Sequence, residues 1–218
     1  MNIVISGANR GIGLALTKHY SKNHRVFALC RQASDALLAF PGVDIVTGID
    51  VCDQASIDSA VSQCSGTVDI LINNAGILDR VTLDDMDEQT MLNHWNVNAM
   101  GPIRVTTSFR ELLSKGSKVI MISSRMGSIE DNDSGAHYAY RMSKTALNMA
   151  AKSMAIDFKD AGIYVGIIHP GWVQTDMTGH TGHYDVNVAA TQIMNRIHDL
   201  NETTSGQFFH SNGDRLSW

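Results

Sequence analysis

The sequence contains few of the residues that mark specialised protein classes. Its three cysteines, Cys30, Cys52 and Cys64, are an odd number without the spacing of a metal site, and we interpret them as reduced thiols. Three prolines and no low-complexity stretch leave no candidate for a linker. No apolar run approaches the roughly 18 residues that a membrane span needs. These absences predict one domain over residues 1–218, with no membrane partner.

Positive charge is also scarce. Lys and Arg number 17 against 22 Asp and Glu, for a formal net charge of −5, so no basic face for nucleic acid is expected. The first apolar run starts at residue 2, which leaves no room for a signal peptide, and we expect a cytoplasmic protein. The composition, 44% hydrophobic and 18% charged, is typical of a soluble domain with a sizeable core.

The first distinct motif is an apolar run followed by a glycine-rich turn and a helical pattern. Residues 2–6 are apolar except at their ends, and Gly7, Gly11 and Gly13 follow. Glycine lets a pyrophosphate approach the main chain, and the next helix offers free N–H groups to phosphates. The spacing is Gly-x3-Gly-x-Gly, whereas the commonest dinucleotide fingerprint is Gly-x-Gly-x2-Gly. The turn alone is also compatible with a strand-to-helix connection that binds nothing.

Strand-like and helical patterns alternate along the chain. We predict strands over residues 2–6, 25–30, 43–49, 68–72, 117–122, 164–168 and 207–210, and helices over about 12–20, 34–40, 53–64, 87–113, 136–161 and 186–200. A kink is expected at Gly101-Pro102 in the long helix. This alternation predicts an α/β fold, a Rossmann-like doubly wound parallel sheet of about seven strands with helices on both faces. Residues that follow the strands should then meet at one edge of the sheet.

A tyrosine and a lysine carry the predicted chemistry. Tyr140 and Lys144 are four residues apart on a predicted helix and share a face. An ammonium nearby lowers a tyrosine pKa from about 10, which would let Tyr140 transfer a proton near neutral pH. Ser124, after the fifth predicted strand, could bond the same reacting oxygen. Such a pair also occurs on solvated helices, but the glycine turn and Asn73–Gly76 favour an active site. Tyr138 lacks a lysine four residues on, so we interpret it as a packing or pocket-wall residue.

Together these motifs resemble the short-chain dehydrogenase/reductase family along the whole chain, and the last six residues resemble its C-factor and sniffer-like carbonyl reductase branch. The matches are the glycine turn, Asn-Asn-Ala-Gly, a helical asparagine, the serine, Tyr-x3-Lys and Pro-Gly-x3-Thr. The resemblance implies the catalytic residues Ser124, Tyr140, Lys144 and Asn98. It also implies a cofactor site made by Gly7, Asn9, Arg10, Gly11, Ile12, Gly13, Arg31, Asp50, Val51, Asn74, Ala75, Gly76, Tyr140, Lys144, Pro170, Gly171, Val173 and Thr175.

The resemblance further implies a mechanism. NAD(P)H gives hydride to the carbonyl carbon of a small-molecule substrate, while Tyr140 protonates the oxygen and Ser124 holds it. Lys144 lowers the tyrosine pKa and binds the ribose, and Asn98 belongs to a proton relay through water. Ser124 and Tyr140 are 16 residues apart, more than is usual in the family, and we expect the acidic segment Glu130–Asp133 to bulge near the site mouth. A homo-oligomer, dimer or tetramer, is implied as well.

Cofactor choice can be argued from the second predicted strand. An NAD site needs an acid about 20 residues beyond the glycine turn, but this strand ends in Cys30 and Arg31. Arginine suits a 2′-phosphate through paired N–H donors, so we predict NADP(H). Arg10 is a second candidate cation, or an exposed loop charge. The alternatives are an NAD-linked alcohol dehydrogenase and a dinucleotide-binding regulatory protein with little turnover.

The remaining polar residues and methionines are not assigned to a functional site. We expect no metal, because His180 and His183 lack a third ligand nearby. We interpret these histidines as mobile loop residues, with substrate contact the main exception. Two helical arginines are interpreted as solvated and three helical methionines as packed against the core: Arg104 and Arg110, and Met142, Met149 and Met154.

Overall fold

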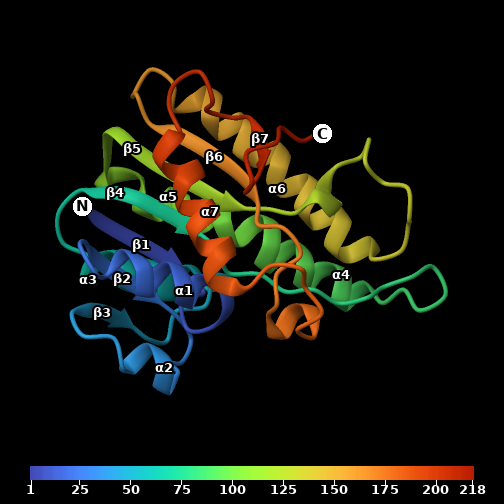
Figure 1. Ribbon diagram of the computed structural model, residues 1–218, viewed down its shortest axis with the longest axis horizontal. Coiled ribbons are helices and arrows are strands. Elements are labelled where there is room, and N and C mark those ends of the chain that lie inside the picture. The colour runs from blue at the N-terminus through green and yellow to red at the C-terminus, as the bar shows by residue number, and fades with distance from the viewer.

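The computed structural model describes residues 1–218 as one parallel sheet between two layers of helices (Figure 1). The strands are β1 (Asn2–Ser6), β2 (Arg25–Leu29), β3 (Val43–Val46), β4 (Val68–Asn73), β5 (Leu113–Ile122), β6 (Tyr164–His169) and β7 (Phe208–His210). They lie in the order β3-β2-β1-β4-β5-β6-β7, and every neighbouring pair is parallel. The predicted fold class is therefore confirmed.

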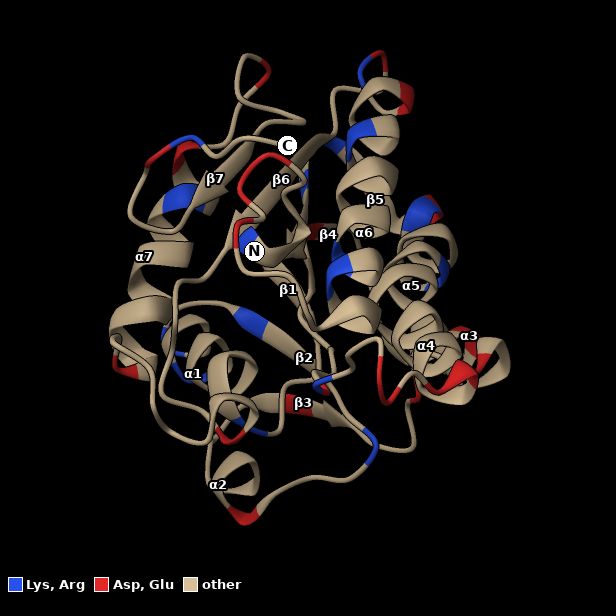
Figure 2. Ribbon diagram, turned by 90° about the vertical axis from the view of Figure 1, so that its right-hand side faces the viewer, with Lys and Arg blue, Asp and Glu red and all other residues tan.

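Helices cover both faces of this sheet (Figure 2). They are α1 (Gly11–Tyr20), α2 (Asp35–Leu38), α3 (Gln54–Gln63), α4 (Glu88–His94), α5 (Gly101–Phe109), α6 (Tyr138–Asp157) and α7 (Val186–Asp199), with short turns η1 (Trp95–Met100), η2 (Arg110–Leu112), η3 (Arg125–Gly127) and η4 (Asp176–Thr178). Side chains of α3, α5 and α6 build one core with the sheet, and those of α1, α2 and α7 build the other. No helix in the structure is long and apolar enough to cross a membrane.

The strands are apolar because the sheet is buried on both faces. In β1, Val4 belongs to one core, while Ile3 and Ile5 belong to the other. All three side chains are fully buried, and burial of such a side chain stabilises the fold by about 1.5–3 kcal/mol. Strands buried on both faces are expected to be continuous apolar runs, which is why the sequence pattern identified them.

Two predicted helix starts are confirmed by their capping bonds. The Ser34 hydroxyl accepts the Leu37 N–H at the start of α2. The Asp53 carboxylate accepts two N–H groups in the first turn of α3, those of Ala55 and Ser56. Each cap satisfies backbone donors that have no partner inside the helix.

The long predicted helix is interrupted earlier than expected. A π-helical turn, η1, separates α4 from α5, so the irregularity lies just before Gly101-Pro102. Pro102 lacks an N–H and cannot donate to the preceding turn, and the chain continues as α5 with Pro102 in its first turn. π-Helical turns are rare and occur mostly at functional sites. Asn98, predicted to be catalytic, lies inside this one.

The helix that carries Tyr140 is shorter than predicted. Gly135, Ala136 and His137 all have positive φ, at 61°, 50° and 52°, and this left-handed backbone cannot belong to a right-handed helix. α6 therefore begins at Tyr138 and not at residue 136. Consecutive left-handed non-glycine residues are strained, and such strain concentrates near functional sites.

Three interpretations of single side chains were wrong, those of two methionines and one arginine. Met142 and Met149 are 57% and 68% exposed on α6, whereas Met154 packs against the core as expected. Arg104 is not simply solvated, because its guanidinium donates to the Asn96 side chain and to backbone carbonyls, while Arg110 is exposed as predicted. An apolar stripe on a helix does not by itself show whether it faces the core or a partner.

The sheet has a switch point between β1 and β4. β2 and β3 extend the sheet on one side of β1, and the chain then returns to place β4 on its other side. The Ser6 hydroxyl accepts the N–H groups of Asn74 and Ala75, and the Asn74 side chain donates to the carbonyls of Ser6 and Gly7. Ligands of open α/β sheets bind at such a switch point, outside the carboxyl ends of the strands.

The cap of α3 gives a test of the fold. We expect Asp53→Ala to lower the free energy of unfolding by about 1 kcal/mol, because two N–H groups lose their acceptor. Asp53→Asn keeps an acceptor and should change it by only a small fraction of that amount. Urea denaturation of the three proteins measures the difference. Equal stability of Asp53→Ala and the wild-type protein would contradict the capping role.

Candidate active site

The glycines after β1 are required by packing as well as by backbone conformation. Gly7 and Gly11 have positive φ, at 67° and 53°. A Cβ atom on Gly7 would lie 2.8 Å from the Ala75 Cα, and one on Gly13 would lie 2.2 Å from the Gly7 carbonyl oxygen. Neither contact is sterically possible. The turn after β1 therefore lies directly against the turn after β4 and leaves its main chain bare.

The start of α1 has free hydrogen-bond donors. Arg10 precedes the helix in an extended conformation, with φ −156°, and its side chain makes no capping bond. The first turn contains no acidic residue. The N–H groups at a helix start carry partial positive charge and have no partner inside the helix. The bare glycine turn and this uncapped helix together fit the pyrophosphate of a dinucleotide.

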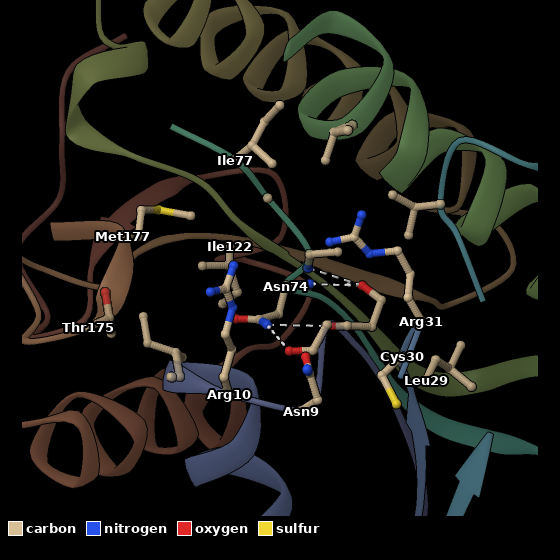
Figure 3. Close-up of a pocket in the computed structure, with 18 of the residues that line it drawn as sticks. Asn9, Arg10, Leu29, Cys30, Arg31, Asn74, Ile77, Ile122, Thr175 and Met177 are labelled. Carbon is tan, nitrogen blue, oxygen red and sulfur yellow. Dashed lines mark hydrogen bonds between the residues drawn. The ribbon is translucent and has the colours of Figure 1, made fainter. Parts of the chain in front are cut away.

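A cavity lies over the switch point and extends from the glycine turn to α6 (Figure 3). It is lined by 25 residues, of which 15 were predicted for the cofactor site. These are Gly7, Asn9, Arg10, Gly11, Ile12, Arg31, Asp50, Val51, Asn74, Ala75, Gly76, Tyr140, Lys144, Pro170 and Thr175. Residues that follow β1, β2, β3, β4 and β6 all contribute to this lining, so the structure brings the predicted residues together.

Other predicted residues support the cavity without lining it. Gly13 packs behind Gly7, and Val173 is buried. Gly171 has φ 88°, and a Cβ there would lie 2.8 Å from the Tyr184 ring. These residues hold the turns that line the cavity.

Ten lining residues were not predicted. They are Ser6, Leu29, Cys30, Ile49, Ile77, Val97, Ile122, Ser123, Asp176 and Met177. Several are the last residues of a strand or the first after it, a position that the strand-end rule could have identified. Val97 belongs to the π-helical turn, which no sequence pattern indicated.

Two arginines reach the cavity from opposite sides (Figure 3). Arg10 extends from the glycine turn, and its Nη1 lies 3.3 Å from the Asp176 carboxylate. Arg31 follows β2 and is exposed. Cys30 beside it is buried, and burial raises the pKa of its thiol. The end of β2 therefore offers a guanidinium and no carboxylate.

Arg104 supports the far end of the cavity. Its Nη1 lies 3.5 Å from the Val51 carbonyl oxygen and 3.3 Å from that of Asn96. A Cβ on Gly101 would lie 2.9 Å from the Val51 side chain, so α5 packs tightly against this loop. Arg104 therefore links the cavity loop at Asp50 and Val51 to the π-helical turn.

Ser124, Tyr140 and Lys144 lie together at the carboxyl end of β5. All three side chains are buried. The Lys144 Nζ donates to the Ile122 carbonyl at 2.9 Å and lies 5.7 Å from the Tyr140 ring centre. A Cβ on Gly127 would lie 2.8 Å from the Lys144 carbonyl carbon, so the turn after Ser124 packs directly on α6. The spacing of 16 residues is accommodated by an exposed loop before α6.

Burial decides the protonation of these groups. It raises the pKa of Tyr140 to about 12, and the hydrogen bond with Ser124 opposes this shift only in part. It also lowers the pKa of Lys144 to about 8. The expected lowering of the Tyr140 pKa by Lys144 is therefore not found, and desolvation of the phenolate is the dominant influence on that pKa. Tyr140 therefore keeps its proton at neutral pH, and Lys144 carries its charge below about pH 8.

Asn98 joins three parts of the site. Its Oδ1 accepts the Ile77 N–H at 2.9 Å, while its Nδ2 donates to the Ile77 carbonyl at 2.9 Å and to the Ser143 hydroxyl at 3.0 Å. The side chain is fully buried. Asn98 thus fixes the segment after Gly76 against α6.

The loop between Ser124 and α6 is held by local polar contacts. Asp131, in the acidic segment, pairs with Arg125, the residue after Ser124. The Glu130 N–H donates to the Trp218 carbonyl at 2.9 Å. The acidic segment is therefore tied both to the end of β5 and to the last residue of the chain.

The two histidines after Thr175 lie at the surface. His180 is exposed, with its Nε2 3.0 Å from the Asp176 carboxylate, and His183 is also exposed. No group of three or more His, Cys, Asp or Glu side chains is placed to hold a metal ion.

Comparison with known proteins agrees with this geometry. Residues 1–185 match the family model described as short chain dehydrogenase, and this range includes both the glycine turn and the pair Tyr140 and Lys144. The C-signal protein of Myxococcus xanthus is 41% identical over 162 residues, which cover 73% of this chain and 98% of that protein.

Solved structures with the same fold extend over the whole chain. The NADPH-bound carbonyl reductase from chicken fatty liver superposes with a TM-score of 0.92 at 30% identity, covering 100% of this chain and 98% of that one. The carbonyl reductase Sniffer of D. melanogaster superposes with a TM-score of 0.91 at 30% identity, covering 100% and 99%. The chain therefore belongs to the short-chain dehydrogenase family and is an oxidoreductase of the kind that includes these carbonyl reductases.

Proposed function

We propose that this protein uses NADP(H) to interconvert a small-molecule carbonyl compound and its alcohol by hydride transfer, with Tyr140 as the acid and base. The observation that carries the proposal is the position of Tyr140 and Lys144. Both line the same cavity as the glycine turn. Lys144 bonds the end of β5, on one side of β1, whereas Arg31 and Asp50 follow β2 and β3 on the other side. A dinucleotide bound along this cavity would place its reactive ring beside Tyr140. The likeness to an NADPH-bound carbonyl reductase supports the same assignment.

The residues divide the work of proton transfer. The bound cofactor supplies or accepts the hydride. Tyr140 donates its proton to the carbonyl oxygen during reduction, and its pKa of about 12 keeps that proton available at neutral pH. Ser124 lowers the pKa of Tyr140 in part and would hold the same oxygen. Lys144, charged below about pH 8, would hold the ribose and favour the phenolate that forms.

The choice of NADP(H) follows from the charges at the cavity end. Arg10 and Arg31 both line the cavity, and the side chain beside them at the end of β2 is the thiol of Cys30. A 2′-phosphate carries negative charge and suits two guanidinium groups. The NAD-linked alternative would need a carboxylate where Cys30 stands. A regulatory protein with little turnover would not need Ser124, Tyr140 and Lys144 together at one end of the cavity. Their presence there favours an enzyme over a regulatory protein.

The exposed apolar side chains of α4, η1 and α6 support a homo-oligomer. Leu92, Trp95, Met142, Met149 and Ile156 are between 46% and 68% exposed. The last three repeat every seven residues, so they share one side of α6. Apolar side chains gathered on neighbouring helices are typical of a surface that a second copy covers. Sedimentation of the purified protein tests whether it is a dimer or a tetramer.

A cofactor-linked screen tests the proposed reaction. NADPH oxidation is measured with a panel of aldehydes, ketones and quinones, and NADP⁺ reduction with the matching alcohols. Turnover of at least one pair in both directions is the expected result. Tight NADPH binding with no turnover on any member of the panel would favour the regulatory alternative.

The role of Tyr140 predicts the effect of removing one hydroxyl. Tyr140→Phe should reduce turnover by about 100-fold or more, because the proton donor is lost, while NADPH affinity stays within about twofold. Tyr138→Phe, two residues earlier, is the matched control and should keep most activity. Steady-state kinetics and fluorescence titration with NADPH measure the two effects. Near wild-type turnover of Tyr140→Phe would show that another group donates the proton.

The lowered pKa of Lys144 predicts how cofactor binding depends on pH. Below about pH 8 the side chain is an ammonium that can bond the ribose, and the charge is lost as pH rises through that value. The affinity of the wild-type protein for NADPH should therefore fall between about pH 7 and about pH 9.5. Lys144→Met should bind about tenfold or more weakly at about pH 7, with little change over this range. If NADPH binding by Lys144→Met depended on pH as it does in the wild-type protein, the assignment of this pH dependence to Lys144 would be wrong.

The end of β2 predicts the cofactor preference. A hydrogen bond to a charged group contributes roughly 1.5–3 kcal/mol, so we expect NADPH to exceed NADH by at least about tenfold in kcat/KM. Cys30→Asp with Arg31→Ala should reverse the preference, because it removes attraction to the phosphate and adds repulsion. Competing rates with one substrate at low salt measure the ratio. Equal use of both cofactors by the wild-type protein would refute the prediction.

A further inference from the structure

The segment between β4 and α4 begins as a wall of the site. We call residues 77–81 the active-site wall, since they continue from Gly76 and Ile77 lines the cavity. This wall has no regular secondary structure, so its backbone groups need partners elsewhere. Every second residue of the wall has such a partner. Ile77 is bonded on both its N–H and its carbonyl by the Asn98 amide. The Val81 carbonyl accepts the Tyr138 N–H at 3.1 Å.

The middle anchor of the wall is a histidine that the sequence did not identify. The Asp79 N–H donates to the Nε2 of His94 at 3.0 Å. His94 is the last residue of α4, one helical turn before Asn98, and its side chain is fully buried. The wall is thus held at three alternate residues by Asn98, His94 and the first turn of the helix that carries Tyr140.

Both ring nitrogens of His94 form hydrogen bonds with backbone groups. The Nδ1 lies 2.9 Å from the Thr90 carbonyl oxygen, which can only accept, so Nδ1 carries the hydrogen. The Nε2 is then an acceptor, as the bond from the Asp79 N–H requires. The Asp79 carboxylate lies 3.8 Å from Nε2, beyond hydrogen-bond distance. One tautomer therefore satisfies every contact, and the ring has a single orientation.

The same ring contacts the tyrosine. The rings of His94 and Tyr140 meet edge to face, with centres 6.5 Å apart and planes at 86°. Edge-to-face packing is a favourable arrangement for aromatic pairs. His94 thus touches the wall through Nε2 and Tyr140 through its ring. No other side chain in the structure combines a bond to the wall with a ring contact to Tyr140.

We propose that His94 is a positioning residue, which sets the distance between the active-site wall and the Tyr140 ring and so aligns the substrate carbonyl with the proton donor. The inference rests on the proposed function. A misplacement of about 1 Å can slow an enzyme by about 100-fold, so a side chain that fixes this distance can strongly affect the catalytic rate. The Thr90 bond lies within α4 and only orients the ring, whereas the Asp79 bond holds the wall.

Two substitutions separate these bonds. In His94→Gln the side-chain oxygen can take the place of Nε2 and accept the Asp79 N–H. In His94→Asn the shorter amide can take the place of Nδ1 and donate to Thr90, but it does not reach Asp79. Both variants lose the ring, so they differ mainly in the bond to the wall. Ser117→Ala is the stability control, because it removes a buried bond to the carbonyl of Val68, the first residue of β4, far from the site.

The kinetic result should separate the two variants. For a carbonyl substrate, we expect His94→Asn to lower kcat/KM by about tenfold or more relative to His94→Gln, with NADPH affinity within about twofold in both. Ser117→Ala should keep wild-type kinetics whatever its loss of stability. The proposal is overturned if His94→Gln and His94→Asn have the same kcat/KM, or if His94→Asn matches the wild-type protein.

Hydrogen exchange gives a readout that needs no activity. The Asp79 amide should be protected in the wild-type protein and in His94→Gln, and should exchange faster in His94→Asn. Rapid exchange at Asp79 in the wild-type protein would overturn the inference even if neither variant folds. Absence of carbonyl turnover in the wild-type protein, with Asp79 protected, would instead count against the proposed function and leave His94 as an anchor of the wall alone.

Discussion

The site depends on the junction between β1 and β4. The two strands are far apart in the sequence, and between them the side of β1 on which new strands are added reverses. Four hydrogen bonds close this junction, all donated by Asn74 and Ala75 after β4 to Ser6 and Gly7 at the end of β1. If the junction opened, the glycine turn and the segment after β4 would move apart, and the cavity floor would be lost. The glycine turn that carries Arg10 and the segment that leads from Gly76 into the active-site wall both continue directly from this junction.

At the other end of the cavity, charge is held where water is largely excluded. Burial opposes the phenolate of Tyr140 and the ammonium of Lys144 alike, so in the unbound protein each is pushed toward its neutral form. The Lys144 ammonium has one protein acceptor, the Ile122 carbonyl. A ligand that offers further acceptors beside Lys144 would favour its charged form. The protonation of Tyr140 and Lys144 therefore depends on what binds beside them. On an exposed helix, water would hold both pKa values near their ordinary range.

Much of this could be predicted from the sequence, because strands buried on both faces leave continuous apolar runs and the residues after them must meet at one edge. The caps at Ser34 and Asp53 were predictable for a similar reason, since they depend on local bonding. The π-helical turn and the left-handed residues before Tyr138 were not, because tertiary packing imposes them. Nor was the pKa of Tyr140, since desolvation depends on the whole surrounding structure. In the sequence His94 is one polar residue inside the long predicted helix, and only its buried contacts distinguish it.

The packing of the glycine turn has a consequence for how such sequences evolve. Gly7 lacks room for a Cβ because of Ala75, and Gly13 because of the Gly7 carbonyl and the Asn74 side chain, and in neither case because of any ligand. Selection for folding alone would retain them in a descendant that had lost its chemistry. The charged and hydroxyl groups around Tyr140 have no such protection, because burial of Lys144 costs stability and apolar replacements would relieve that cost. In a lineage that abandons catalysis, the glycine motif should therefore outlast the lysine.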